Sequence, residues 1–515
     1  MKKIIIKFIV ILFFLYTVPL SATNYYVAAN GSSSNNGTIG SPYNFSTALV
    51  YASAGDTIFL RTGTYTFTSR ITISKSGTSE NNKVCIMAYQ PDLVSAYPTD
   101  ARPVFDFSGM AYGSGNQGIY LSGCNYLHIK GIRVYGAGDN GMQLRQTNNC
   151  IIEFCDFYKN RDSGFQMMDG SSNNLILNCD SYMNADIEPG VDDGGDADGF
   201  APKLTVGTGN VFRGCRAWLN SDDGWDGYLK TTTEYPDGMT TTLENCWTWF
   251  NGYYWDGSDF ITNSGMNGNG FKLGGSDNKD EAHNFILKRC LSFNNKAKGF
   301  DQNNNAGSIT LYNCSAYNNE GQDYMFNSSG VTYASDSEFK VSNCIALGTS
   351  GTSFRSTTIK ETNDFSTAQS DYVSTDTTGI GGQRTVDGEL PALDFMHLQT
   401  NEPATDLIDA GTIVEGIQYN GDYPDLGCFE TGAPLPTFVV NNALIDVSVY
   451  PNPAVDYFKI SLNADGKVVT IYSIQGALLK KVTLNSQVQK IDVSGLKSGV
   501  YIVKISSEKI KLIKM

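Results

Sequence analysis

The sequence predicts an all-β protein: a right-handed parallel β-helix followed by a small C-terminal antiparallel β-sandwich. The chain of 515 residues is rich in residues typical of strands and turns, with 53 Gly, 29 Tyr and 27 Phe. Between about residues 120 and 350, cysteines recur in similar local sequences, as in a solenoid. Beyond residue 446, short runs alternate apolar and polar residues between turns, as in a sandwich.

The first 22 residues have the layout of a secretory signal peptide. Lys2 and Lys3 precede an apolar run, and the small residues Ser21 and Ala22 follow it. No later segment reaches the roughly 18 apolar residues that a membrane span needs. We therefore expect a protein that is secreted or displayed at the cell surface, without a membrane span.

The formal net charge of −15 excludes the electrostatics of a nucleic-acid-binding protein. An acidic protein can still bind an acidic polymer if a divalent cation bridges the two sets of carboxylates. Calcium is the expected cation, and we expect a monomer whose partner is an acidic polysaccharide.

The N-terminal part of the mature chain reads as the start of the solenoid. A short strand and a polar turn precede an amphipathic helix near residues 45–54. Because the end of a β-helix exposes strand edges and core, we expect this helix to cap the first coil.

Seven cysteines mark the repeat, and six of them have Asn five residues later. Their intervals of 24 to 44 residues suit coils that differ in loop length. Stacked coils about 4.8 Å apart would align the repeated residues into ladders, with Cys filling the interior and Asn satisfying backbone groups. We assign structural roles to both sets: Cys155, Cys179, Cys215, Cys246, Cys290, Cys314 and Cys344, and Asn160, Asn184, Asn220, Asn251, Asn295 and Asn319.

A Gly-aromatic pair follows the Asn on five coils and locates a site. The pairs are Gly164-Phe165, Gly199-Phe200, Gly224-Trp225, Gly270-Phe271 and Gly299-Phe300. If the aromatic rings point inward, their neighbours point outward. Asp198 should then lie near Asp223, and Asp226 near Lys272, with Asp222 beside them.

Four converging carboxylates would repel one another unless a cation lay among them, and Ca²⁺ prefers oxygen ligands of this kind. The sequence therefore predicts a calcium site at Asp198, Asp222, Asp223 and Asp226. Two alternatives stay open: an acidic face without an ion, and a separate calcium loop within residues 192–198.

Lys272 lies in the segment MNGNGFKLGG, where the flanking glycines leave access for a bulky ligand. Removal of the proton next to a uronate carboxylate needs a base and a cation that stabilises the developing charge. Lys272 beside calcium would supply both, so we predict it as the catalytic base. Its alternative role is an ion pair with Asp226.

The segments DADGFAPKL, GNVFRGCRAWLNSDDGWDGY and NGNGFKLGG resemble polysaccharide lyase family 9. That resemblance implies a right-handed parallel β-helix that cleaves pectate or a related acidic polysaccharide by β-elimination. It also implies calcium at the four aspartates named above and Lys272 as the base. It covers roughly residues 23 to 350.

The substrate carboxylates would need basic partners, because a guanidinium can bind a carboxylate with two hydrogen bonds. The candidates are Lys298, Arg213 and Arg145, of which Lys298 is the best placed by its column. The long stretch between Asp226 and Lys272 carries several aromatic residues, which are either an aromatic subsite or loop packing.

The chain continues with residues 351–432, which we expect to pack on the β-helix as loops and short strands. Residues 433–445 read as a Pro-containing linker. Residues 446–515 resemble the C-terminal sorting domain of the type IX secretion system, through YPNP, IYSIQG and LKSGVYIVKI. The resemblance implies the type IX secretion machinery as a partner. The alternative is a carbohydrate-binding module.

Together these observations predict a catalytic domain at residues 23–432 that is a calcium-dependent lyase. A β-helical polygalacturonase is the rival enzyme, and it would use paired carboxylates about 6.5 to 9.5 Å apart. None of His128, His283 and His397 lies in a Gly-His-Gly setting, and hydrolysis would leave Lys272 unexplained. A binding protein without turnover is the non-enzymatic rival.

Overall fold

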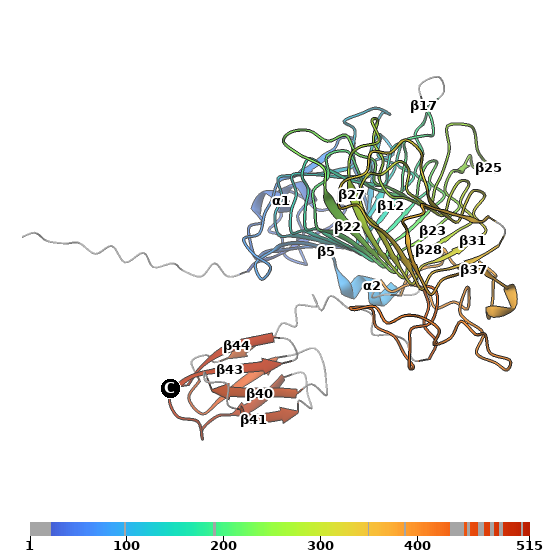
Figure 1. Cartoon of the computed structure of the whole chain (residues 1–515). Helices are drawn as coiled ribbons and strands as arrows, with labels where there is room; N and C mark the ends of the chain where they lie inside the picture. Colours follow the sequence, from blue (N-terminus) through green and yellow to red (C-terminus); the bar gives the residue numbers. More distant parts are fainter. Residues whose placement is uncertain are drawn as a thin grey trace, which may run out of the picture. The chain divides into compact units, whose positions relative to one another are not determined.

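The structure is a computed structural model, and its chain forms two compact units, Met1–Ala433 and Pro434–Met515 (Figure 1). In the first unit it describes residues 22–96, 99–188, 192–348, 350–385 and 388–432. In the second it describes residues 448–450, 454–461, 468–473, 478–483, 488–505 and 508–514. The predicted signal peptide, apart from Ala22, and the predicted linker lie outside these residues, so both stay predictions.

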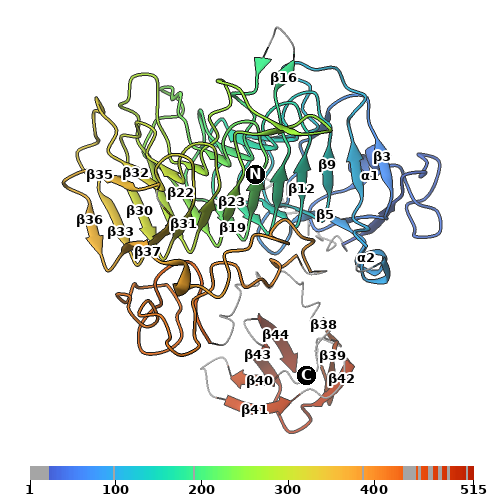
Figure 2. The same ribbon diagram turned by 90° about the vertical axis from the view of Figure 1, so that its right-hand side faces the viewer.

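The first unit is a parallel β-helix in which each full coil contributes one strand to each of three sheets (Figure 2). The chain runs from sheet 1 to sheet 2 to sheet 3 and then into the next coil. In sheet order, sheet 1 contains β1 (Asn24–Val27), β2 (Thr57–Leu60), β5 (Val84–Ala88), β8 (Leu127–Lys130), β11 (Ile151–Glu153), β14 (Leu175–Leu177), β19 (Asn210–Arg213), β22 (Met239–Glu244), β27 (His283–Lys288), β30 (Ile309–Tyr312), β33 (Phe339–Ser342) and β36 (Ile359–Glu361).

Sheets 2 and 3 stack in the same chain order. Sheet 2 contains β3 (Thr64–Thr66), β6 (Val104–Asp106), β9 (Arg133–Tyr135), β12 (Asp156–Tyr158), β15 (Asp180–Tyr182), β20 (Arg216–Trp218), β23 (Trp247–Trp249), β28 (Leu291–Phe293), β31 (Ser315–Tyr317), β34 (Ile345–Leu347) and β37 (Asp364–Thr367). Sheet 3 contains β4 (Ile71–Ile73), β7 (Ile119–Ser122), β10 (Met142–Arg145), β13 (Phe165–Met168), β18 (Phe200–Pro202), β21 (Trp225–Asp226), β26 (Phe271–Lys272), β29 (Phe300–Asp301), β32 (Tyr324–Phe326) and β35 (Thr352–Phe354).

Two sharp bends per coil explain the repeated sequence. The residue before each repeat cysteine has a positive φ, for example Asn178 at 52° and Asn245 at 53°. The residue before each ladder asparagine does too, for example Lys159 at 54°. Asn and Gly adopt this left-handed conformation most readily, and single such residues turn the chain between sheets.

The predicted ladders are confirmed. Each ladder asparagine donates a side-chain hydrogen bond to the next, at 2.9, 2.8, 2.9, 2.9 and 2.9 Å from Asn160 to Asn319. The seven repeat cysteines are buried, and none of the eleven cysteines forms a disulfide. The inward rings of sheet 3 stack with centroids 4.8 to 5.1 Å apart from Phe200 to Tyr324.

The N-terminal end carries the expected helix, α1 (Phe45–Tyr51), whose N-cap Asn44 accepts a hydrogen bond from the Thr47 amide. Phe45 packs edge-on against Phe105 with centroids 4.9 Å apart, which covers the first coils. A second helix, α2 (Gln90–Ala96), follows β5.

At the other end the stack continues further than the sequence indicated. We expected the repeat to stop near residue 350, but β35, β36 and β37 add another coil that ends at Thr367. The loss of the Asn ladder does not end the coils, because strand pairing with the previous coil continues without it. A 3₁₀ helix, η1 (Gln369–Asp371), then begins an irregular segment.

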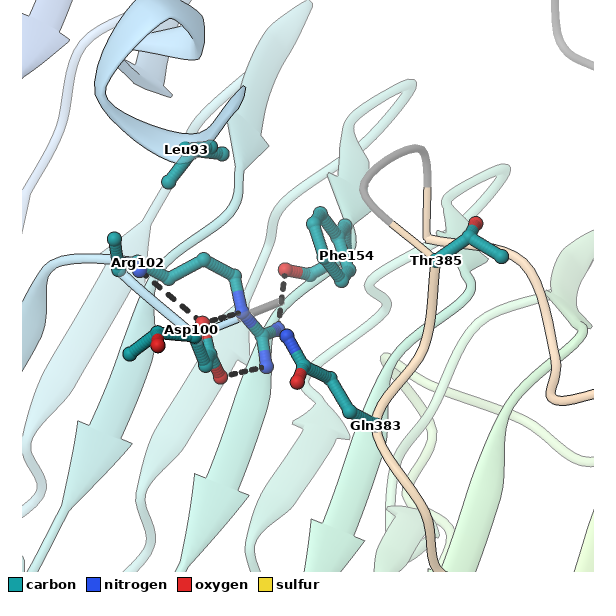
Figure 3. Close-up of a pocket in the computed structure, with 8 residues that line it drawn as sticks. Leu93, Asp100, Arg102, Phe154, Gln383 and Thr385 are labelled. Carbon is teal, nitrogen blue, oxygen red and sulfur yellow. Dashed lines mark hydrogen bonds and ion pairs between the residues drawn. The ribbon is translucent and has the colours of Figure 1, made fainter. Parts of the chain in front are cut away.

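Residues 372–428 pack on the outer face of sheet 2, as expected for this part of the chain. Their apolar side chains form one buried cluster with Trp247, Trp249 and Phe293 of that sheet. A cavity of about 20 Å³ lies between α2 and this segment, lined by Arg102, Phe154 and neighbours (Figure 3). It has room for about one water molecule and belongs to the scaffold.

The C-terminal unit consists of two small antiparallel sheets, which confirms the predicted fold class. One contains β38 (Ser448–Tyr450), β39 (Tyr457–Ser461) and β42 (Val488–Asp492). The other contains β41 (Leu478–Thr483), β40 (Val468–Ser473), β43 (Gly499–Ile505) and β44 (Glu508–Lys514). Side chains of both, including Phe458 and Val503, share one core. Among the described residues no helix is long and apolar enough to cross a membrane.

Candidate active site

The candidate site lies on the outer face of sheet 3, where successive strands pair in register. The inward column runs as predicted through Phe165, Phe200, Trp225, Phe271 and Phe300, all buried. The next residue on each strand therefore faces outward. In the strand register, Asp226 is the neighbour of Lys272 on the adjacent strand, and Lys272 is the neighbour of Asp301.

The turns that lead from sheet 2 into sheet 3 carry the other acidic residues and the longest insertions. Asp198 lies at the end of the insertion that contains the hairpin of β16 (Ile187–Glu188) and β17 (Asp192–Asp193). A second hairpin, β24 (Tyr254–Trp255) and β25 (Phe260–Ile261), rises from the turn before β26. These loops border the outer face of sheet 3 on its sheet 2 side.

Asp198, Asp222 and Asp223 each offer a carboxylate oxygen, and these oxygens lie within 4.8 Å of one another. All three residues are buried. Asp198 Oδ1 accepts a hydrogen bond from the Asp223 amide at 3.3 Å. Asp223 Oδ1 accepts two from Asn269, at 2.6 Å from its amide and 2.8 Å from its side chain. Backbone and side chain thus hold the group in place.

Asp226 lies beside these three and faces two lysines. Lys272 Nζ is 3.4 Å from Asp226 Oδ1 and 3.0 Å from Asp223 Oδ2. Lys203 Nζ is 3.4 Å from Asp226 Oδ2 and 2.6 Å from Asp198 Oδ2. The ion pair between Lys272 and Asp226 that the sequence left open is therefore present.

The carboxylates keep both lysines charged. Burial lowers the pKa of Lys272, but Asp223 and Asp226 outweigh burial and raise that pKa well above its usual value. In the same way Asp198 and Asp226 outweigh burial at Lys203, whose pKa is also raised well above the usual value.

The cluster has more negative than positive charge, and at least one of its carboxylate oxygens accepts no hydrogen bond among the described residues. Four carboxylates face two ammonium groups, which leaves two formal negative charges when all are ionised. In the described part of the chain, no hydrogen bond reaches Asp222 Oδ1, although the residue is buried. Burial and then the neighbouring Asp223 raise the pKa of Asp222 well above its usual value. These oxygens fit Ca²⁺, which binds about six to eight hard ligands.

The predicted substrate-binding residues fall in different places. Lys298 adjoins the cluster, since its amide donates to Asn269 Oδ1 at 3.2 Å, and its Nζ pairs with Asp301 Oδ2 at 2.8 Å. Arg145 is on the outer face of sheet 3, four strands from Lys272, and pairs with Asp169 at 3.2 Å. Arg213 is on β19 of sheet 1, where it pairs with Glu244 at 2.7 Å, so the structure does not bring it to the cluster.

The aromatic stretch before Lys272 has two parts. Trp247 and Trp249 are buried under residues 372–428 and belong to the scaffold. Trp255 packs on Phe260 in the hairpin with centroids 4.8 Å apart, and the Phe260 side chain is exposed. The stretch is therefore loop packing at its start and an exposed aromatic hairpin further on.

The histidines are structural. His283 is buried, its Nδ1 is 2.9 Å from the Gly227 carbonyl oxygen, and burial lowers its pKa to about 4. His128 pairs with Glu153 on sheet 1, and His397 stacks on Phe429 with centroids 4.2 Å apart. None of them lies in the carboxylate cluster.

The sequence prediction missed Lys203 and Asn269. Lys203 lies in the DADGFAPKL segment, two residues after the outward Ala201, so alternation along β18 would have placed it on the outer face. Asn269 occupies the column position of Asp198 and Asp223, immediately before the Gly of its coil. Its position was visible in the sequence, but its hydrogen bonds to Asp223 were not.

Residues 25–343 match the family described as the Pel9A-like, right handed beta helix region. The chain belongs to this family. The match confirms the predicted handedness of the β-helix and the resemblance to a pectate lyase family. Residues 448–515 match the secretion system C-terminal sorting domain, which confirms the predicted sorting domain of the type IX system and a secreted or cell-surface location.

Characterised relatives cover most of the chain. Pectate lyase L of Dickeya chrysanthemi is 38% identical over 420 residues, which is 79% of this chain and 90% of that protein. Pectate lyase PEL9 of Emericella nidulans is 32% identical over 314 residues, covering 54% of this chain and 69% of that protein. These relatives confirm the prediction of a polysaccharide lyase.

Solved structures agree. The crystal structure of pectate lyase Pel9A has a TM-score of 0.69 at 36% identity and covers 80% of this chain and 96% of that one. A rhamnogalacturonan lyase has a TM-score of 0.61 at 24% identity, with 74% of this chain and 97% of that one covered, and shares the fold.

Proposed function

We propose that the protein is a secreted, calcium-dependent pectate lyase that cleaves polygalacturonate or a related uronate polymer by β-elimination, with Lys272 as the base. Family membership supports pectate lyase chemistry, and the charge imbalance of the cluster supports the calcium site. The observation that carries the proposal is the position of Lys272 Nζ, 3.0 Å from Asp223 and 3.4 Å from Asp226.

In this proposal Asp198, Asp222, Asp223 and Asp226 hold the cation. Calcium bound there would neutralise the carboxylates and stabilise the charge that develops on a substrate carboxylate. With the carboxylates neutralised, the pKa of Lys272 falls and its amine becomes available as a base.

Lys272 Nζ then takes the proton from C5 of a uronate. The electrons of the C5–H bond form the C4–C5 double bond, the C4–O4 bond breaks, and the leaving oxygen takes a proton from water. The Lys272 side chain is 15% exposed, which leaves a path to the outer face of sheet 3 where the polymer would lie. Residues Asp223 and Asp226 orient the amine before substrate arrives.

Other residues would bind neighbouring sugars. Lys298 adjoins the catalytic strand and can exchange its partner Asp301 for a substrate carboxylate. Arg145, four strands away on the same face, would contact a more distant uronate. Arg213 has no such position, because it lies on sheet 1.

The remaining predictions stay part of the proposal. A signal peptide at residues 1–22, a catalytic domain at residues 23–432, a linker at residues 433–445 and a sorting domain at residues 446–515 would carry a monomeric enzyme to the type IX machinery. The net charge of −15 argues against nucleic acid as a partner.

The test follows ultraviolet absorbance of the C4–C5 double bond during incubation with polygalacturonate, in calcium and in chelator. A rise that requires calcium is the expected result. New reducing ends without this absorbance would contradict elimination, and a rise of equal rate in chelator would contradict the role of calcium. Rhamnogalacturonan as a parallel substrate defines how broadly the enzyme acts.

A further inference from the structure

We infer that Lys203 is a built-in counter-ion of the carboxylate cluster: it lies against Asp198 and Asp226 and offsets part of their negative charge, so that the protein stays folded without metal and two formal negative charges remain for one divalent cation. The part of this inference that concerns the divalent cation rests on the proposed function. The part that concerns stability without metal does not.

The local sequence delivers Lys203 to this position. On β18 Phe200 points inward and Ala201 outward, between Gln166 on one side and Asp226 on the other. Ala201 has no side chain beyond Cβ, and the longer side chain of Lys203 contacts Asp198 and Asp226. The Leu204 amide donates to the Tyr228 carbonyl at 2.6 Å, which fixes the backbone next to Lys203.

Lys203 completes the hydrogen bonding of Asp198. Oδ2 of Asp198 accepts from Lys203 Nζ at 2.6 Å and from Ser163 Oγ at 3.1 Å. Its Oδ1 accepts from the Asp223 amide at 3.3 Å. Both oxygens therefore have partners from the protein itself, although the residue is fully buried.

Both carboxylate oxygens of Asp226 also have partners from the protein itself. Its Oδ2 faces Lys203 Nζ at 3.4 Å, and its Oδ1 accepts from the Tyr228 amide at 2.9 Å and faces Lys272 at 3.4 Å. Among the described residues, by contrast, Asp222 Oδ1 and Asp223 Oδ2 accept no hydrogen bond, although Lys272 Nζ is 3.0 Å from the latter. Asp198 and Asp226 therefore have hydrogen-bond or ion-pair partners for both oxygens, whereas Asp222 and Asp223 each have one oxygen without a hydrogen bond among the described residues.

The physical consequence concerns removal of Lys203. A buried carboxylate that loses its partner is strongly destabilising, because the charge stays out of water without compensation. A divalent cation could take over the neutralising role, and a ligand that binds only the folded state stabilises it by mass action. Without Lys203 the folded state should therefore depend on calcium.

The experiment compares the full-length protein with Lys203→Met, which keeps most of the side-chain stem. Thermal unfolding is followed by tryptophan fluorescence at one scan rate, in chelator and in calcium. All five tryptophans lie between residues 218 and 255, so the signal reports on the β-helix and not on the C-terminal unit. In chelator the unfolding temperature should fall by at least about 5 °C. Calcium should restore most of that loss and stabilise the variant more than the wild type.

Two further variants serve as controls. Lys298→Met removes a lysine that pairs with Asp301 outside the cluster, so its unfolding temperature should change equally in calcium and in chelator. Lys203→Met combined with Asp198→Asn removes both charges and should regain stability in chelator. If the single variant does not fold in chelator, folding of the double variant supports the inference and its failure to fold overturns it.

The opposite results are equally clear. A Lys203→Met variant that loses the same stability in calcium as in chelator, or none in chelator, would overturn the inference. A wild-type protein without lyase activity or calcium response would contradict the proposed function instead. In that case the loss in chelator and its recovery in the double variant still decide whether Lys203 neutralises Asp198.

Discussion

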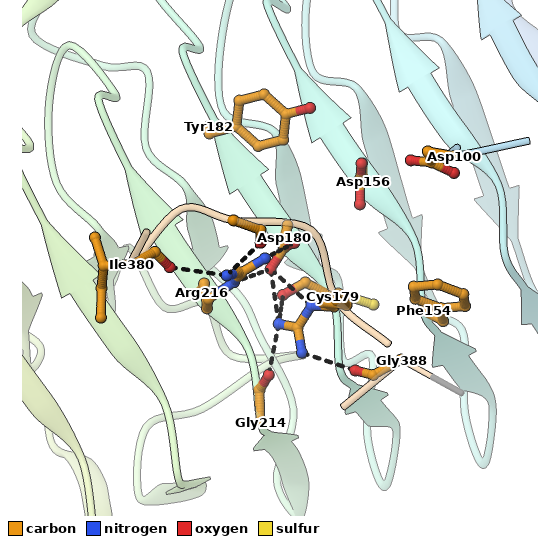
Figure 4. Close-up of polar contacts among 12 residues, drawn as sticks. Asp100, Phe154, Asp156, Cys179, Asp180, Tyr182, Gly214, Arg216, Ile380 and Gly388 are labelled. Carbon is orange, nitrogen blue, oxygen red and sulfur yellow. Dashed lines mark hydrogen bonds and ion pairs between the residues drawn. The ribbon is translucent and has the colours of Figure 1, made fainter. Parts of the chain in front are cut away.

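The β-helix has two buried clusters of aspartates and cations, one on sheet 2 and one on sheet 3, which differ in how far the cations neutralise the carboxylates. On sheet 2, Asp180 receives Arg216 at 2.7 Å and Arg384 at 2.7 Å, and Arg384 also donates to the Gly214 and Gly388 carbonyls (Figure 4). On sheet 3, three of the four aspartates (Asp198, Asp223 and Asp226) form ion pairs with Lys203 and Lys272. Asp180 and the four aspartates of sheet 3 occupy outward positions of stacked strands or their turns.

The two clusters differ in their net charge and in whether another segment of the chain packs over them. The sheet 2 cluster has two arginines for the one carboxylate of Asp180, and residues from the segment 372–428 lie against it, since Arg384 binds Asp180 and the Ile380 carbonyl accepts from Arg216. The two arginines outweigh burial and lower the pKa of Asp180. The sheet 3 cluster has two excess negative charges when all four carboxylates are ionised, and Asp222 Oδ1 accepts no hydrogen bond from the residues that the structure describes. A balanced cluster therefore serves the scaffold, whereas the unbalanced cluster is suited to a ligand.

The largest effect is expected at the base. Lys272→Ala should lower kcat by about 10²- to 10⁴-fold, because a general base contributes that much. In saturating calcium, folding and calcium binding should survive, since the proposed ligands remain and the cation neutralises the carboxylates that lose Lys272. Steady-state lyase rates and a calcium titration check this, and Lys298→Ala is the matched control with a smaller loss. Activity retained in Lys272→Ala would remove this residue from the mechanism.

Arg384→Met should give the largest loss of stability. It leaves Asp180 buried with Arg216 as its only remaining strong partner, so the unfolding free energy should fall by about 3–5 kcal/mol. The loss should be the same in calcium and in chelator, and the activity per folded molecule should not change. Denaturant unfolding measures it.

Arg213→Met is its control, because that arginine pairs with Glu244 at the surface of sheet 1 and should contribute less than about 1 kcal/mol. A calcium-dependent loss in Arg384→Met would break the distinction between the two clusters. A raised KM in Arg213→Met would return that residue to the substrate site.

Asp223→Ala should raise the calcium concentration needed for half-maximal rate by at least about tenfold, equivalent to ~1.4 kcal/mol of binding free energy. Asp223 is the carboxylate that contacts Lys272 and shares the close oxygen cluster, so activity should fall together with calcium affinity. Calcium titrations of the initial rate measure this. An unchanged calcium requirement would argue against Asp223 as a ligand.

The smallest expected effect is a difference in the free energy of unfolding between variants of Asp222 and Asp226, measured in chelator. The pKa of Asp222 is raised, so its ionisation costs stability as the pH rises above the pKa of the unfolded chain. Asp222→Asn should then stabilise the chelated protein at neutral pH by about 1 kcal/mol. The pKa of Asp226 is lowered because Lys272 and Lys203 outweigh its burial, so Asp226→Asn should destabilise by a similar amount.

Denaturant unfolding in chelator at neutral pH compares these two variants directly. Changes of the same sign would contradict the contrast between Asp222, which has no ion pair among the described residues, and Asp226, which faces two lysines.

Much of the site was readable from the sequence because a solenoid turns sequence spacing into spatial neighbourhood. Once the Gly-aromatic pairs were aligned, the pairing of Asp226 with Lys272 followed from strand alternation, and the structure has it. The Cys and Asn ladders followed for the same reason. Sorting-domain and family motifs, which are local, were equally visible.

Other features depended on contacts that no local pattern carries. Strand alternation predicts correctly that the Arg213 side chain points outward, but it does not say on which sheet. Arg213 lies on sheet 1, because the bends around each coil decide which sheet a strand joins. The burial of Trp249 and the pairing of Arg384 with Asp180 join segments far apart in the chain.

The sequence by itself determined the β-helix, the column of acidic residues with Lys272, and the C-terminal sandwich, because each is encoded in short repeated patterns. Only the tertiary structure decided which carboxylates are satisfied and which are not. Three features depend on side-chain direction and on packing between coils: the contacts of Lys203 with Asp198 and Asp226, the lack of a hydrogen bond to Asp222 Oδ1 among the described residues, and the packing of residues 372–428 on sheet 2. A sequence pattern gives the order of the residues but not these contacts.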